Sequence, residues 1–244
     1  MCFLLLAPTS AAQEDTGSTP GERAPRTASP TPPPFGACLQ QAYPESICGL
    51  EAGHLVFCDG DRMQIAEVAA MFAERYPREA LTGVPTTDPG RTRHEPLFLK
   101  LYGADKAAVR GTLATVVWMP KTVGRKLKVT ARHGVAARLQ KVSDELDQLP
   151  APIRQIVADT SGTFVWRKIR GTDRLSMHSF AIAIDVGVPN ADFWKWRKTY
   201  RNRIPLEVVA IFEKHGFIWG GKWLHFDTMH FEYRPELLNP LCAP

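Results

Sequence analysis

The sequence of 244 residues contains no long apolar run after its first few residues. Because a membrane-spanning helix needs roughly 18 to 20 apolar residues, we expect no integral membrane segment in the mature protein. No internal repeat is visible, and no basic run is interleaved with aromatic residues. The net charge of +5 fits either a solvated surface or attraction to an anionic polymer. Without a nucleic-acid-binding motif, we expect no nucleic-acid partner.

The sequence also lacks the His-Glu-x-x-His motif, in which two histidines one helical turn apart bind zinc. His94 and Glu95 come closest, but Phe98 stands where the second histidine belongs. Any metal site must therefore be built from residues that lie farther apart in the chain.

The N-terminus indicates export. Residues 1–13 combine a short apolar run with Ser10, Ala11 and Ala12, small residues that suit a cleavage site. The basic segment that normally precedes such a run is missing, so we expect residues 1–12 to be a signal peptide truncated at its start. Residues 13–36 hold six prolines among small and charged residues. Such a stretch buries too little apolar surface to fold, which predicts a disordered tether.

Four cysteines follow the predicted signal, namely Cys38, Cys48, Cys58 and Cys242. An even number in an exported protein permits two disulfides with three possible pairings. If disulfides form, we expect Cys242 to join the C-terminal tail to the front half. The alternative is four reduced, partly buried thiols.

Hydrophobic periodicity predicts an α+β fold, with a small, mostly antiparallel sheet and helices packed against it. Residues 79–98 read as loop. The expected helices cover residues 63–75, 135–149 and 205–215, and the expected strands cover 114–119, 126–130, 181–186 and 229–233.

The last quarter of the chain carries candidate metal ligands. His178 precedes Asp185 by seven residues, and Asp227 precedes His230 by three. Asp185 lies in the apolar run Ala-Ile-Ala-Ile-Asp-Val, where an unpaired carboxylate would cost several kcal/mol. Two imidazoles and one carboxylate would leave a position open for water, as in catalytic zinc sites.

Residues 162–185, with Ser-x-His followed by Asp185, and residues 216–232, with Asp-x-x-His, resemble the M15 family of zinc peptidases. The family includes D-alanyl-D-alanine carboxypeptidases and the L-alanyl-D-glutamate endopeptidases of phage endolysins, and the likeness is closest to the endolysin branch. It implies a Hedgehog/DD-peptidase-like zinc peptidase fold. The implied core is residues 151–240, and residues 37–150 form a family-specific N-terminal region.

The resemblance also implies roles for individual residues. The zinc (Zn²⁺) ligands would be His178, Asp185 and His230, and Asp227 takes the position of the catalytic acid/base. Ala181 departs from the family pattern, where glycine is common, and so does Gly187, where asparagine often stands.

A further set of residues is expected around the ligands. Arg167 resembles the arginine that steadies the substrate carbonyl or carboxylate, with Arg170 and Arg174 as competitors. Ser176 would hold the ligand loop. Substrate-binding roles are expected for Ser176, Trp223 and His225, although Trp223 also suits the core.

Together these features predict a zinc-dependent peptidase that hydrolyses peptidoglycan stem peptides in the bacterial periplasm. Either carboxypeptidase or endopeptidase activity is compatible with the motifs. The alternative is a non-catalytic, zinc-containing module that binds the cell wall, because a fold alone implies no function.

Overall fold

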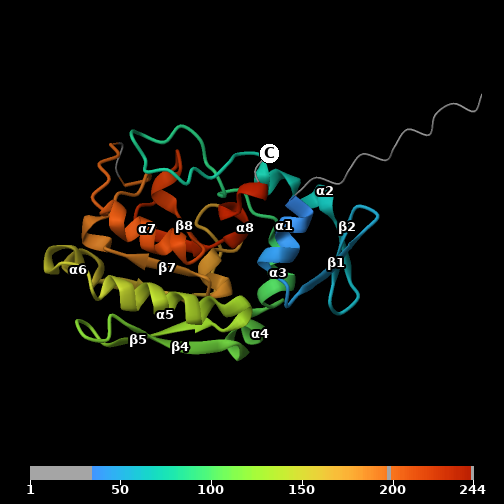
Figure 1. The fold of residues 1–244 in the computed structure, drawn as a ribbon, viewed down its shortest axis with the longest axis horizontal. Coiled ribbons are helices and arrows are strands. Elements are labelled where there is room, and N and C mark those ends of the chain that lie inside the picture. The colour runs from blue at the N-terminus through green and yellow to red at the C-terminus, as the bar shows by residue number, and fades with distance from the viewer. Residues whose placement is uncertain (1–34, 197–198, 243–244) are drawn as a thin grey trace, which may run out of the picture. The chain divides into compact units, whose positions relative to one another are not determined.

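The structure is a computed structural model that describes residues 35–196 and 199–242, within one compact unit, Pro32–Pro244 (Figure 1). The predicted signal peptide and most of the predicted tether lie outside the described residues. The last two residues assigned to the tether, Phe35 and Gly36, already belong to helix α1 (Phe35–Ala42). The predicted tether therefore extends two residues too far. Among the described residues, no helix is long and apolar enough to cross a membrane.

An antiparallel sheet of four strands forms the centre of the C-terminal half. Its order is β6-β7-β9-β8, and each neighbouring pair is antiparallel. The sheet, with helices packed around it, confirms the predicted α+β class. The strands are β6 (Thr160–Gly162), β7 (Ala183–Val186), β8 (Phe217–Trp219) and β9 (His230–Tyr233).

A hairpin and two helices complete this half. Strands β4 (Leu113–Trp118) and β5 (Arg125–Thr130) pair antiparallel, as predicted, and helix α5 (Val135–Leu146) lies along them (Figure 1). Helix α5 also contacts α7 (Leu206–Lys214), the predicted third helix. Each helix turns a row of apolar side chains inward: Val135, Leu139, Val142 and Leu146 on α5, and Val208, Val209 and Phe212 on α7.

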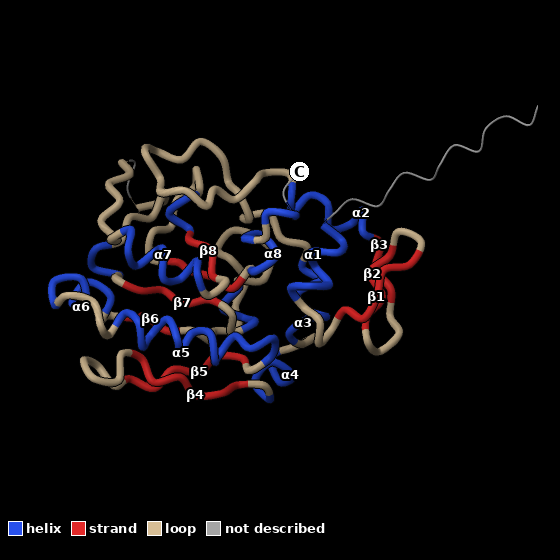
Figure 2. The backbone as a smooth tube through the Cα atoms, viewed as in Figure 1, coloured by secondary structure: helices blue, strands red, loops and turns tan. Residues whose placement is uncertain are grey.

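The predicted helix over residues 63–75 is wrong in its first part. Strands β1 (Ile47–Glu51), β2 (His54–Phe57) and β3 (Arg62–Gln64) form a separate small sheet (Figure 2). Gln64 is still extended because it pairs with His54 in that sheet. The chain then continues as α2 (Ile65–Val68) and a 3₁₀ turn (Ala69–Phe72), so the helical spacing of the apolar residues reflects two short elements.

Several helices were missed by the sequence reading. Helix α3 (Glu95–Tyr102) begins inside the segment read as loop, with a proline in its first turn, and buries Leu97, Phe98 and Leu101. Proline suits that position because the first amides of a helix have no partner within it. The remaining helices are α4 (Lys106–Gly111), α6 (Ala151–Val157) and α8 (Pro235–Leu238), and further 3₁₀ turns cover Arg132–Gly134, Met177–Phe180, Val188–Asn190, Gly220–Lys222 and Pro240–Cys242.

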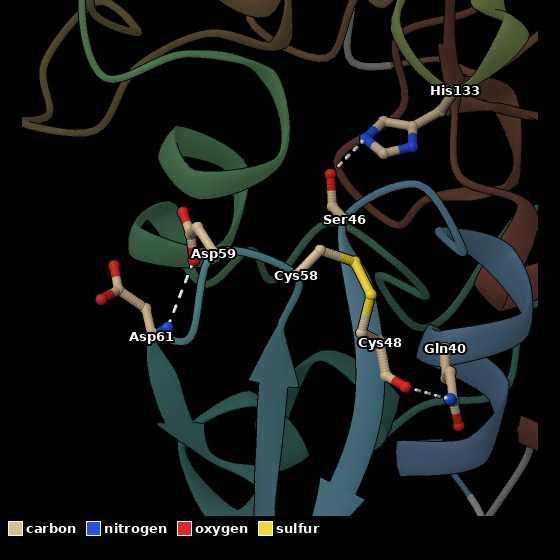
Figure 3. Close-up of a disulfide and its surroundings, with 7 residues drawn as sticks. All are labelled: Gln40, Ser46, Cys48, Cys58, Asp59, Asp61 and His133. Atoms are coloured by element: carbon tan, nitrogen blue, oxygen red, sulfur yellow. Dashed lines mark hydrogen bonds between the residues drawn. A yellow bond between two sulfur atoms is a disulfide. The ribbon is translucent and has the colours of Figure 1, made fainter.

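Two disulfides join the cysteines. One links Cys38 on α1 to Cys242, which confirms that the C-terminal tail is tied to the front half. The other links Cys48 to Cys58 across the β1–β2 pair (Figure 3). Close to it, Ser46 Oγ lies 3.2 Å from His133 Nε2, so the small sheet is also attached to the turn before α5.

Candidate active site

The register of β7 and β9 brings the first two candidate ligands together. Asp185 on β7 lies directly opposite His230 on β9. His178 belongs to the 3₁₀ turn Met177–Phe180 just before β7. Ala181 then takes a left-handed conformation, with φ of 55°, which turns the chain into the strand. That conformation favours glycine, so the glycine common in the family at this position has a physical reason.

The three side chains form a group that could hold a metal ion. One ligand atom from each of His178, Asp185 and His230 lies within 4.8 Å of the others. Asp185 Oδ1 is 3.2 Å from His178 Nε2 and 3.1 Å from His230 Nδ1. Both histidines are buried, with 4% and 7% of their surface exposed. Two imidazole nitrogens and one carboxylate oxygen are a donor set that suits zinc.

The charges inside this group are strongly coupled. Burial alone would raise the pKa of Asp185, but the neighbouring His178 and His230 outweigh it and hold that pKa well below its usual range. Burial would lower the pKa of His230, yet its hydrogen bonds to Asp185 and Glu232 raise it to about 10. The site thus stabilises positive charge between its carboxylates, which is also what a divalent cation requires.

Each imidazole has a fixed partner on its other nitrogen. His178 Nδ1 donates to the Thr163 carbonyl at 3.1 Å, so its Nε2 faces Asp185. His230 Nε2 donates to Glu232 Oε2 at 2.9 Å, so its Nδ1 faces Asp185. Such partners orient metal-binding imidazoles and select their tautomer. Ser176 Oγ accepts the His178 backbone N–H at 3.4 Å, which makes Ser176 the cap of the ligand turn.

Glu232 belongs to a buried ionic network that the sequence reading did not identify. Its carboxylate accepts hydrogen bonds from Arg93 and from Arg234. Arg234 in turn binds Glu236, whose other oxygen accepts from Tyr43 on α1 at 2.6 Å. The only sequence signal was the period-two spacing of His230 and Glu232, which puts both side chains on one face of β9.

Asp227 lies next to the ligand group. Its backbone N–H donates to the Gly220 carbonyl at 2.9 Å, and its own carbonyl accepts the His230 N–H at 3.1 Å. Its Oδ1 is buried without a hydrogen-bond partner among the described residues. Burial raises the pKa of this carboxyl to about 7, although the nearby His230 opposes the shift. A buried oxygen without a partner is costly, and a substrate or water would satisfy it.

The arginine that sequence reasoning favoured lies on the exposed side of this region. Arg167 has its backbone held on both sides by Ser179, since its N–H donates to Ser179 Oγ at 3.0 Å and its carbonyl accepts from that hydroxyl at 2.9 Å. Its positive charge acts on Asp227 and lowers the pKa of that carboxyl. The competitors Arg170 and Arg174 are exposed on the turn that follows.

The other two expected substrate-binding residues differ in their surroundings. Trp223 is only 3% exposed, and its ring packs on His230 at 5.7 Å between centroids while its indole N–H donates to the Pro89 carbonyl. Trp223 therefore packs against the ring of a candidate ligand, His230, and helps to hold that ring in place. His225 is half-exposed and holds the Asp88 carboxylate through its Nδ1 at 2.6 Å. Asp88 gave no sequence signal, because it lies in a segment read only as loop.

A sheet that presents two imidazoles and a carboxylate, with a further free carboxyl beside them, is typical of metal-dependent hydrolases. Residues 170–233 match the family model described as D-alanyl-D-alanine carboxypeptidase, which supports an M15 family peptidase. The matched segment contains all three candidate ligands and Asp227, while Arg167 and the front half lie outside it. No curated protein and no solved structure matches the chain significantly.

Proposed function

We propose that this peptidase is zinc-dependent and hydrolyses amide bonds in peptidoglycan stem peptides. The observation that carries the proposal is the His178–Asp185–His230 group, with the unpartnered carboxyl oxygen of Asp227 beside it. The match to a D-alanyl-D-alanine carboxypeptidase model supports the substrate class. The two disulfides are typical of oxidising compartments, which supports export to the bacterial periplasm.

His178 and His230 would hold the zinc ion through the nitrogens that face Asp185, and Asp185 would complete the protein ligands. A zinc ion in such a site polarises the scissile carbonyl and makes water a better nucleophile at neutral pH. Thr163 and Glu232 keep the two imidazoles in the tautomers that this binding requires.

Asp227 is the proposed acid/base. Its buried oxygen has no other hydrogen bond to give up, so it can take a proton from the attacking water and return it to the leaving amine. Arg167, whose charge already acts on Asp227, would stabilise negative charge that develops on the substrate carbonyl oxygen.

The test is an Asp227→Asn variant assayed with its zinc content measured. We expect the purified parent to bind about one zinc ion per chain and to cleave muropeptides, and we expect the variant to keep zinc while losing about 100-fold or more in kcat. Asp173→Asn is a matched control, because the Asp173 side chain is fully exposed. A variant as fast as the parent would contradict the role of Asp227.

Mass spectrometry of the digested muropeptides distinguishes the two activities. Loss of one D-alanine indicates a D-alanyl-D-alanine carboxypeptidase, and a cut beside L-alanine indicates an L-alanyl-D-glutamate endopeptidase. A parent protein that holds zinc and binds peptidoglycan yet releases no product would instead be the non-catalytic wall-binding module.

A further inference from the structure

A loop from the front half lies against the segment that carries Asp227. This segment, residues 86–93, is outside the part matched to the family model. Gly90 has a φ of 77°, and a Cβ there would lie 2.5 Å from Leu237, so only glycine allows this close approach. The loop is held by hydrogen bonds from Leu224 N to Thr87 O (2.6 Å), His225 N to Asp88 Oδ1 (3.0 Å), Trp223 Nε1 to Pro89 O (2.8 Å) and Arg234 Nη1 to Gly90 O (2.9 Å).

Arg91 ends the turn of this loop, and its guanidinium forms only a long ion pair. Its Nη1 is 3.8 Å from Asp88 Oδ2, which is too long for a hydrogen bond. Both oxygens of Asp88 already accept from His225. The Arg91 side chain is 28% exposed, and within the described part of the chain its guanidinium donates no hydrogen bond. None of its nitrogens is among the buried side-chain atoms without a partner, so its five N–H donors are accessible to a ligand.

Charges of both signs act on Arg91. The negative charges of Asp88 and Asp227 act on Arg91 in one sense, and the positive charges of Arg93 and Arg174 act on it in the opposite sense. Arg93 is neutralised by its pair with Glu232, whereas Asp88 is shared with His225. Arg91 also lowers the pKa of Asp227, as Arg167 does. Two arginines from distant parts of the chain therefore act on one carboxyl group.

We propose that Arg91 binds the free C-terminal carboxylate of the substrate and so directs this peptidase to the last peptide bond. The inference rests on the proposed function, in which a stem peptide lies beside Asp227. A carboxylate is the anion that every free peptide end offers, and the planar guanidinium binds it through two parallel hydrogen bonds. Arg167 then remains available for the scissile carbonyl.

The experiment compares two peptides that end in D-alanyl-D-alanine, one with a free C-terminal carboxylate and one with a C-terminal amide. Each is assayed with the zinc-loaded parent, Arg91→Met and Arg91→Lys. Arg110→Met is the control, because Arg110 is an exposed arginine on α4. Zinc content and thermal midpoint are measured for every variant.

We expect the parent to prefer the free acid, and Arg91→Met to lose about 100-fold in kcat/KM for the acid, mainly through KM. Its loss on the amide should be much smaller than its loss on the acid, so that the ratio of acid to amide hydrolysis falls toward one. Arg91→Lys should recover part of the preference, because it keeps the charge without the planar fork. Arg110→Met should behave as the parent.

The inference is overturned if Arg91→Met keeps the parent's ratio of acid to amide hydrolysis, or if the parent cleaves both peptides equally. A parent that cleaves neither peptide contradicts the proposed function separately. In that event, calorimetric binding of both peptides to zinc-loaded Asp227→Asn, with and without Arg91→Met, still decides the matter. A preference for the acid that survives the loss of Arg91 would exclude the carboxylate role.

Discussion

Glu232 holds the ring of His230 from the side opposite to the candidate metal position, with Oε2 2.9 Å from Nε2. Glu232 is fully buried, and two arginines, Arg93 and Arg234, neutralise it. Burial would raise its pKa, but these cations and His230 keep the pKa well below its usual range. Glu232 therefore remains ionised and fixes a proton on Nε2, which leaves Nδ1 to bind a metal.

We expect Glu232→Gln to weaken zinc binding by about 10- to 100-fold, the usual effect of removing a partner of a metal-binding histidine. The amide keeps the size of the side chain but loses the charge that orients the imidazole. Competition with a chromogenic chelator measures the zinc dissociation constant directly.

Glu213→Gln is the matched control for this variant. Glu213 on α7 is also a shielded carboxylate. It pairs with Lys222 at 2.7 Å and does not belong to the ligand group. Both variants should lower the free energy of unfolding, since each breaks a buried ion pair. Equal zinc affinity in the two variants would mean that Glu232 acts through stability alone.

Gly220 sets the position of Asp227. A Cβ at residue 220 would lie 2.6 Å from the Asp227 carbonyl oxygen and 2.9 Å from the Trp223 ring. We expect Gly220→Ala to displace Asp227 and to reduce kcat by about 100-fold, because small misplacements of a catalytic group are costly. The assay should find zinc still bound. Gly111→Ala is a control, because an added Cβ there meets no atom of another segment within 4 Å and the backbone φ of Gly111 is not positive. A fully active Gly220→Ala variant would refute this positioning.

The two disulfides should contribute unequally to stability. Cys38–Cys242 joins residues 204 apart in sequence, whereas Cys48–Cys58 joins residues 10 apart. In the chain-entropy account the longer loop stabilises by about 5 kcal/mol and the shorter by about 3 kcal/mol. Urea unfolding of Cys38→Ala/Cys242→Ala and Cys48→Ala/Cys58→Ala tests this order, and a larger loss for the second pair would contradict it.

His133 should make the protein less stable at mildly acidic pH. Burial lowers the pKa of His133, which lies against the rings of Tyr43 and Tyr102. The unfolded chain then binds a proton near pH 6.5 that the folded chain binds only at lower pH. The contribution of His133 to the free energy of unfolding is therefore fully present above about pH 6.5, and it is lost as the pH falls below that value.

His133→Asn removes this titration and suits the backbone, because residue 133 has φ of 53° and asparagine tolerates that region. Urea unfolding from pH 7.5 to 5 should show a shallower decline for the variant than for the parent. The two proteins share all other titratable groups. Parallel declines would therefore show that groups other than His133 cause the pH dependence.

Local sequence patterns predicted the elements that are long or periodic. The apolar rows of α5 and α7 recur at helical spacing, and the run around Asp185 reads as a buried strand. Patterns failed where strand pairing overrides the helical spacing of apolar residues. Gln64 is an example, because it pairs with His54 and is extended. The patterns also failed for α3, a helix of 8 residues that begins in a segment read as loop and has a proline in its first turn.

The sequence alone determined the chemistry available: which imidazoles and carboxylates exist, and the short spacings that place His178 before β7 and Asp227 before β9. Tertiary structure decided which of them meet. The β7–β9 register sets Asp185 opposite His230. The packing of residues 86–93 against residues 223–225 brings Arg91 close to the segment that carries Asp227. Periodicity encodes the face that a side chain occupies, whereas contacts between distant segments depend on how the whole core packs.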